Sequence, residues 1–241
     1  MRRAGAVLLA VAALALAGGL WFREDLARLH AVNTLFDESR IVGNFSGMDA
    51  LFLTASVSRG DGPVTPLPDG APLDLPAVAA EWVRRTSVTG LVVLDRGAVV
   101  FERAYLGTHL DDRRISWSIA KSFLSALFGI SVARGELALE DPVTAHAPRL
   151  VGSAYDGVSV RDVLTMQSGV TFDEDYLDPR SDINRMGRVL ALGGTMDGFA
   201  AALEARDRPP GREWDYVSID THVLAMVLRG ATGRPLPELM G

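Results

Sequence analysis

The interior of the chain is dominated by an apolar stretch that begins just after Ser118 and continues to Ala133. Almost every position in it is apolar or small, so no polar face recurs at the spacing of a helix turn. The stretch is too short, and too close to polar flanks, to span a bilayer. We therefore predict a helix over residues 117–133 that is buried on all sides in the middle of a domain, and Gly135 is expected to stop it.

A β-hairpin is predicted shortly before this helix. Residues 91–94 are all apolar, Asp95-Arg96-Gly97 has the composition of a turn, and residues 98–105 end in an alternation of apolar and charged side chains. The first strand is expected to lie in the centre of a sheet, whereas the second should keep one face in water. Because a lone hairpin is only marginally stable, it needs further strands or a covering helix.

The rest of the pattern is mostly helical. Helices are expected at residues 24–32, 76–85, 159–168, 199–205 and 221–232, and residues 171–179 are expected to form an acidic surface loop. An isolated hairpin followed by helices indicates the α+β class, with a hairpin and a helical lobe.

The N-terminus carries Arg2 and Arg3 before the uncharged residues 4–22. A cleaved signal peptide is one interpretation, since Ala15-Leu16-Ala17 is a small-x-small site. A retained inner-membrane anchor is favoured by the length of the run and by Trp21 at its edge. In both cases the residues from 23 onward are expected to be exported, as a periplasmic or secreted protein, with an extension and linker at 23–75 and the main domain at 76–241.

The composition argues against several classes of function. The net charge of −6 argues against a nucleic acid partner. The chain has no cysteine, so disulfides and thiol catalysis are excluded. The four histidines are scattered rather than placed at ligand spacing, so we expect no metal site, and no sequence feature calls for a cofactor.

The candidate chemistry lies at the start of the apolar stretch. Lys121 is the only lysine among 24 lysines and arginines. Lysine can lose its proton when it is desolvated, whereas arginine cannot. The positive end of the helix dipole, at the N-terminus, also favours the neutral form of a lysine amine. Ser118 lies three residues earlier, so its hydroxyl falls on the same helix face. A neutral amine beside a hydroxyl is a nucleophile with its base, although a helix-start serine and a snorkelling lysine would have the same spacing.

Four further segments give this pair a context. Residues 117–123, 130–143, 160–169 and 210–218 resemble segments of the serine β-lactamase and penicillin-binding superfamily. The branch they resemble most is the class C-like esterases and amidases, which include the 6-aminohexanoate-dimer hydrolases. The resemblance implies a β-lactamase/transpeptidase-like fold and a serine hydrolase that acts on a small ester or amide. The N-terminal segment adds the expectation that this hydrolase is membrane-anchored and exported.

The resemblance also implies roles for individual residues. Ser118 would attack a carbonyl carbon and form an acyl-enzyme, Lys121 would accept its proton, and Tyr216 would relay a proton to the leaving group. The amide of Ser118 would be one oxyanion donor. Ser218 and Tyr176 are candidates for substrate contacts. Without the resemblance, Tyr216 would be interpreted as a loop tyrosine packed by its ring and Ser218 as a helix-start hydroxyl. The acidic residues 173–175 are expected to form a solvated face.

Two departures from the family pattern qualify this interpretation. The second motif ends in Ser218 rather than asparagine, and no Lys-Thr-Gly or His-x-Gly third motif is present. We therefore expect a domain truncated at its C-terminus, which lacks the strands that complete the sheet. Two alternatives remain open, namely a penicillin-interactive DD-peptidase or β-lactamase and a non-catalytic remnant.

Overall fold

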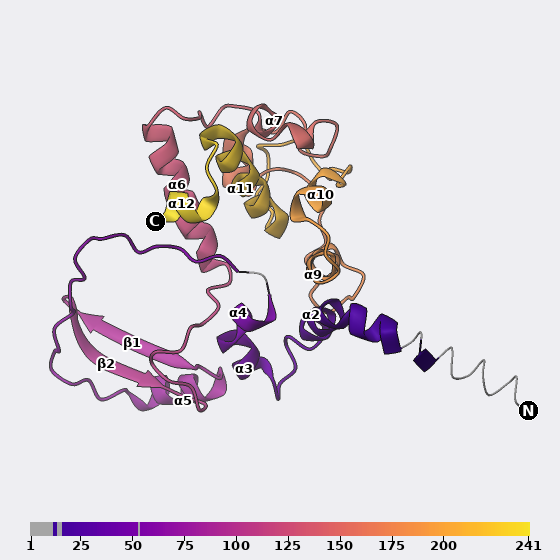
Figure 1. The fold of residues 1–241 in the computed structure, drawn as a ribbon. Helices are drawn as coiled ribbons and strands as arrows, with labels where there is room; N and C mark the ends of the chain where they lie inside the picture. Colours follow the sequence, from indigo (N-terminus) through magenta and orange to yellow (C-terminus); the bar gives the residue numbers. More distant parts are fainter. Residues whose placement is uncertain (1–11, 14–15, 53) are drawn as a thin grey trace, which may run out of the picture. The chain divides into compact units, whose positions relative to one another are not determined.

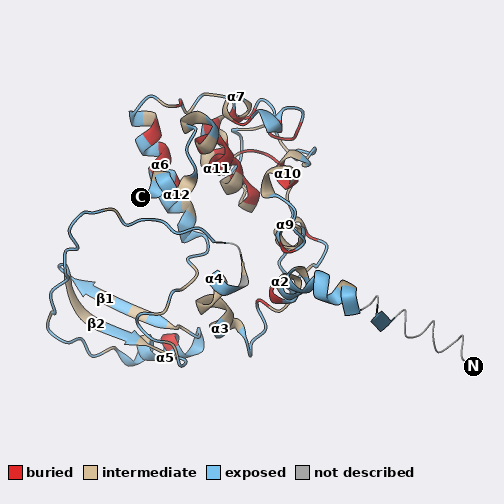
Figure 2. Ribbon diagram, in the orientation of Figure 1, coloured by how far each residue is buried: buried red, intermediate tan, exposed pale blue. Residues whose placement is uncertain are grey.

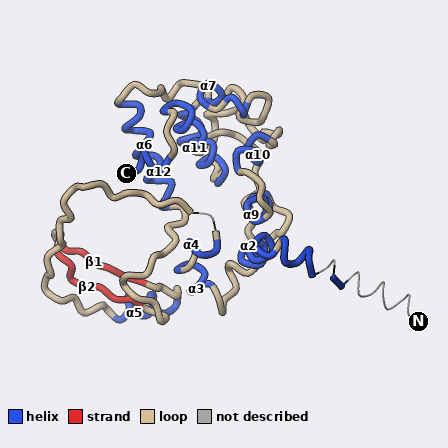
Figure 3. Tube along the Cα trace, in the orientation of Figure 1, coloured by secondary structure: helices blue, strands red, loops and turns tan. Residues whose placement is uncertain are grey.

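The computed structural model describes residues 12–13, 16–52 and 54–241, and it divides the chain into two compact units. One unit contains residues 116–241 together with described residues from 1–33 and 52–58, and the other contains residues 34–51 and 59–115. Figure 1 labels the elements along the chain, and Figure 3 shows that the two strands occur among helices and long loops.

The unit formed by residues 34–51 and 59–115 contains the predicted hairpin. Strand β1 (Gly90–Asp95) pairs antiparallel with β2 (Ala98–Ala104). The two residues between them, Arg96 and Gly97, both have positive φ, which is the conformation of a type I′ hairpin turn. Helix α5 (Ala77–Arg85) confirms the predicted helix before the hairpin, and α3 (Ile41–Ser46) and α4 (Met48–Leu51) are short additions.

The prediction that β1 is a central strand is wrong for the part of the chain that the structure describes. Val92 and Leu94 are about half exposed, and the described sheet has two strands. The other edge, along β2, is occupied by residues 68–73, since the Gly70 amide donates to the Val99 carbonyl at 2.8 Å. An apolar run predicts a strand, but it does not reveal which faces other segments cover.

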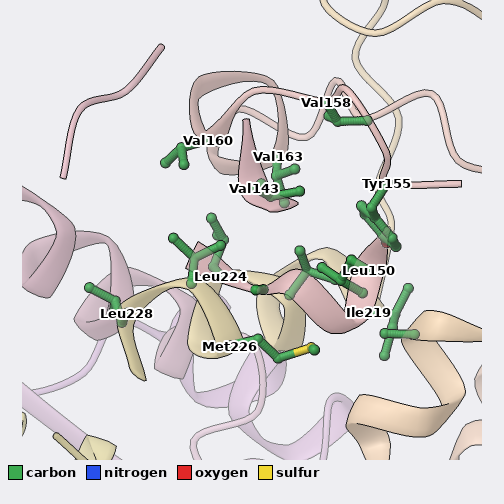
Figure 4. Close-up of a cluster of buried hydrophobic side chains, with 14 of the residues drawn as sticks. Val143, Leu150, Tyr155, Val158, Val160, Val163, Ile219, Leu224, Met226 and Leu228 are labelled. Atoms are coloured by element: carbon green, nitrogen blue, oxygen red, sulfur yellow. The ribbon is translucent and has the colours of Figure 1, made fainter. Parts of the chain in front are cut away.

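The unit that contains residues 116–241 is a helical lobe around α11 (Ser218–Thr232). Its neighbours are α6 (Ile119–Ala133), α7 (Val143–His146), α8 (Val160–Leu164) and α10 (Met196–Ala201). Residues 223–228 of α11 are all buried, and Figure 2 shows this helix as the most continuously buried one in the lobe. Figure 4 shows the core side chains between these elements, with Tyr155 among them.

Helix α6 starts two residues later than predicted, at Ile119, and it is not buried on all sides. Leu124, Leu127 and Phe128 face the core, whereas Ile119 and Phe123 are 65% and 57% exposed. Within the described residues, the expectation of complete burial is therefore wrong. Burial on all sides would require other segments to cover every face of the helix, and the lobe covers one face.

The other helices largely follow the sequence pattern. Helix α2 (Arg23–Asn33) is confirmed, whereas α8 ends four residues before the predicted end and α11 begins three residues before the predicted start. Helix α10 also begins earlier than expected, because Thr195 caps it by accepting a hydrogen bond from the Gly198 amide at 3.1 Å. The prediction missed α9 (Asp182–Ala191), 3₁₀ helix η1 (Pro148–Leu150) and α12 (Leu236–Met240). Helix α9 packs against α2, so part of its stability comes from a segment distant in the sequence.

One helix contact in the lobe requires a glycine. A Cβ atom at Gly230 of α11 would lie 1.7 Å from the carbonyl oxygen of His146 at the end of α7. Because the obstacle is backbone, no side-chain rotation can relieve the overlap. Gly230 therefore sets how closely α7 and α11 approach.

Within the predicted membrane segment, residues 4–22, the structure describes residues 12–13 and 16–22, and the others lie outside the described residues. Where the chain is described, none of its helices combines the length and the apolar character needed to cross a bilayer.

Candidate active site

Ser118 and Lys121 lie together at the N-terminus of α6. Ser118 is the residue immediately before the helix, and Lys121 falls in its first turn. The Lys121 Nζ donates to the Ser118 Oγ at 3.3 Å. Among the described residues no carboxylate forms an ion pair with Lys121. Its amine is hydrogen-bonded to the serine hydroxyl instead.

Tyr216 joins this pair from the residues just before α11. Its hydroxyl lies 2.5 Å from the Ser118 Oγ, and either oxygen can be the donor. The Lys121 Nζ is 5.3 Å from the centroid of the Tyr216 ring, within cation–π range. Three side chains that sequence reasoning selected, two of them 98 residues apart, thus meet at one point.

The backbone before Ser118 is strained. Trp117 has a φ of +45°, a region that bulky L-residues seldom occupy. Such a conformation costs about 1–3 kcal/mol and persists where the surrounding structure enforces it. At this position it turns the chain into α6 and leaves Ser118 exposed to solvent.

The segment that carries Tyr216 is supported by residues 166–171. The Asp215 amide donates to the Met166 carbonyl at 2.8 Å, and the Gly211 amide donates to the Gln167 carbonyl at 2.9 Å. Gly169 allows this close approach: its φ is +71°, and a Cβ there would lie 2.3 Å from the Arg208 carbonyl oxygen.

The acidic loop at residues 171–179 contacts the start of α11, next to Tyr216, through Glu174. Its Oε1 accepts from the Ser218 amide at 2.6 Å, and its Oε2 accepts from the Ser218 Oγ at 3.1 Å. The expectation that Glu174 belongs to a solvated face is therefore wrong, although its neighbours Asp173 and Asp175 are exposed. Because the Ser218 hydroxyl already donates to Glu174, a substrate contact made in this arrangement would use the Ser218 oxygen as an acceptor.

Tyr176, the other candidate for a substrate contact, lies beside this group. Partial burial raises the pKa of its hydroxyl, and the negative charge of Glu174 raises it further. A hydrogen bond with Ser218 lowers this pKa, and the charge of Tyr216 raises it. The side chain is 53% exposed, so it borders the site from the solvent side.

A buried acid lies behind the second motif. Asp220, in the first turn of α11, is fully buried, and its Oδ1 accepts from the Tyr155 hydroxyl at 2.7 Å. Burial raises the pKa of Asp220 to about 7, although hydrogen bonds from Tyr155 and Ser168 lower it. Sequence reasoning missed Asp220, because an acid in the first turn of a helix, between Ile219 and Thr221, is an ordinary pattern.

The site can supply an oxyanion donor but shows no metal centre. The amide of Ser118 makes no hydrogen bond with another described residue, so it is free to donate to a developing oxyanion. In the part of the chain that the structure describes, no cluster of three or more histidine or carboxylate side chains could hold a metal ion. A serine hydroxyl beside an amine, with its own amide free to stabilise an oxyanion, is suited to acyl transfer.

The chain matches a known protein family. Residues 77–241 match the family model described as Beta-lactamase. The chain is 32% identical over 198 residues to the 6-aminohexanoate-dimer hydrolase of Paenarthrobacter ureafaciens, and the alignment covers 78% of this chain and 50% of that protein. The chain thus spans about half the length of this curated relative. These matches confirm the resemblance noted in the sequence.

Solved structures show the same fold. A protein of Bacillus anthracis assigned as a 6-aminohexanoate-dimer hydrolase superposes with a TM-score of 0.72 at 19% identity, covering 85% of this chain and 58% of that one. A protein of Bacteroides dorei assigned as a β-lactamase gives a TM-score of 0.51 at 23% identity, covering 66% of this chain and 46% of that one. The predicted β-lactamase/transpeptidase-like fold is confirmed.

Proposed function

Because this chain belongs to the β-lactamase family of serine hydrolases, we propose that Ser118, Lys121 and Tyr216 form the acylation centre of a protein that cleaves an ester or amide. The observation that carries the proposal is the placement of the Ser118 Oγ, 2.5 Å from the Tyr216 hydroxyl and 3.3 Å from the Lys121 amine. The first distance is short enough for proton transfer, and the second is slightly longer than a catalytic hydrogen bond, as is common in sites without substrate.

The acylation step uses each group once. The Ser118 Oγ bonds to the carbonyl carbon while its proton passes to the unprotonated amine of Lys121. The Ser118 amide stabilises the oxyanion that forms. Tyr216 then donates its proton to the leaving alcohol or amine and regains one from Lys121, so the Ser118 proton is transferred overall to the leaving group. Water later attacks the acyl carbon, releases the acid and restores the Ser118 hydroxyl.

We propose small ester or amide substrates rather than β-lactams. The support is the curated relative named as a 6-aminohexanoate-dimer hydrolase, together with Ser218 in place of the asparagine of class C β-lactamases. Ser218 and Tyr176 border the centre and are the side chains we expect next to the substrate. A fluorescent penicillin should therefore label the protein poorly, whereas strong labelling would favour the penicillin-interactive alternative.

Labelling with a fluorophosphonate probe tests the acylation centre. In the full-length protein, the wild type should be labelled at Ser118, and Ser118→Ala should lose labelling and at least about a thousandfold of p-nitrophenyl ester turnover. Ser122→Ala is the matched control, because Ser122 is an exposed serine of the same helix turn. Retained turnover in Ser118→Ala, or equal loss in Ser122→Ala, would contradict the assignment.

We further propose that residues 4–22 hold the protein in the membrane with the following residues exported. The support is the uncharged run and the exposure of its described end, where Leu20, Trp21 and Phe22 are all more than half exposed. The protein should stay in the membrane fraction after carbonate washing. Recovery of a soluble protein that begins at Gly18 would show cleavage after Ala17 instead.

A further inference from the structure

The bond between Glu174 and Ser218 connects the acidic loop to the start of α11. Ser218 is the first residue of that helix, so its amide has no partner within the helix. The Glu174 carboxylate satisfies this amide at 2.6 Å and also accepts from the Ser218 hydroxyl at 3.1 Å. A negative charge at this end is also favoured by the helix dipole.

Tyr216 lies between two such attachments. On one side, the Asp215 amide is bonded to the Met166 carbonyl at 2.8 Å. On the other, Ser218 is bonded to Glu174. Because Tyr216 is one residue from the first attachment and two from the second, both limit where its hydroxyl can lie relative to Ser118.

The carboxylates of Asp173 and Asp175 bond within the loop rather than to α11. Asp175 Oδ1 accepts from the Leu177 amide at 2.8 Å, and Asp173 Oδ1 accepts from the Asp175 amide at 2.9 Å. These bonds hold the loop to itself. Among the described acidic side chains of residues 171–179, Glu174 is the one that bonds to the segment of Tyr216.

We propose that Glu174 is a positioning residue, which holds the Tyr216–Ser218 segment in place for proton transfer through its two bonds to Ser218. This inference rests on the proposed acyl-transfer function. The proposal predicts that loss of the Glu174 carboxylate displaces the Tyr216 hydroxyl relative to Ser118, in addition to any effect on the stability of the lobe.

Steady-state kinetics of Glu174→Ala and Glu174→Gln in the full chain test the proposal. In the alanine variant kcat should fall on the order of tenfold to a hundredfold with KM little changed, because a small displacement of a reacting group has effects of this size. Glutamine keeps one acceptor oxygen for the Ser218 amide, so it should recover part of kcat. Asp175→Asn, which alters a bond within the loop, is the matched control and should keep kcat.

Hydrogen exchange of the same variants gives a readout that does not need activity. Glu174→Ala should speed amide exchange in residues 171–179 and also in residues 216–222, whereas Asp175→Asn should affect only the loop. Unchanged exchange in residues 216–222, or wild-type kcat in Glu174→Ala, would overturn the proposal. If the wild-type chain is not labelled by the fluorophosphonate, the proposed function fails, and exchange still decides whether Glu174 holds the Tyr216 segment.

Discussion

Replacing Asp220 by asparagine should change how the stability of the lobe depends on pH. Asparagine has the same shape, and its Oδ1 can still accept the hydrogen bond from Tyr155. What it removes is a carboxyl group that is fully buried and whose pKa rises from 3.8 to about 7. The main cause of the rise is burial, and the charges of Asp215 and Glu174 add to it.

The sign follows from which state holds the proton. Between about pH 4 and 7 the folded chain keeps a proton on Asp220 that the unfolded chain releases, so the free energy of unfolding falls as the pH rises. A shift of about three pKa units lowers the free energy of unfolding by about 4 kcal/mol once the pH exceeds 7. About 3 kcal/mol of that loss should develop between pH 5 and 8. Asp220→Asn has no such loss, so its stability relative to wild type should rise by this amount over the same interval.

Urea unfolding followed by circular dichroism at several pH values measures this difference. Taking variant minus wild type at each pH cancels the contributions of the other titrating groups. Tyr155→Phe is the companion variant: loss of its hydroxyl removes a bond that lowers the pKa of Asp220, so the pH dependence should become steeper. A wild-type pH slope in Asp220→Asn would refute the reasoning, because it would mean that Asp220 is charged and compensated in the folded chain.

Three other substitutions have defined outcomes. Lys121→Arg keeps the charge but cannot act as a neutral base, so fluorophosphonate labelling should be lost, and an active arginine variant would mean that the charge alone positions Ser118. Gly230→Ala should destabilise the lobe by about 1–3 kcal/mol or more in urea unfolding, because its Cβ would overlap the His146 carbonyl. The control variant Gly129→Ala adds a Cβ in open space on α6 and should be neutral or slightly stabilising. Ser159→Ala removes the hydroxyl that accepts from the Asp162 amide at the start of α8 and should cost about 1 kcal/mol, and equal stability would show that the cap is dispensable.

The sequence by itself determined the features that depend on neighbours in the chain. Ser118 and Lys121 share a helix face because they are three residues apart, and the structure places their polar atoms in contact. The hairpin follows from two apolar strands around a turn, and α11 ends where Gly233 adopts positive φ. Tyr216 was selected by the resemblance of its segment to a family motif, not by any local pattern.

Only the tertiary structure decided which distant groups meet and which apolar faces are covered. Glu174 and Ser218 are 44 residues apart, and nothing in either segment indicates that they pair. Asp220 resembles an ordinary first-turn acid until the core closes over it, and α6 is apolar on all sides although the lobe covers one of them. Propensity and periodicity are local, whereas burial and long-range hydrogen bonds exist only after segments that are remote in the sequence have packed together.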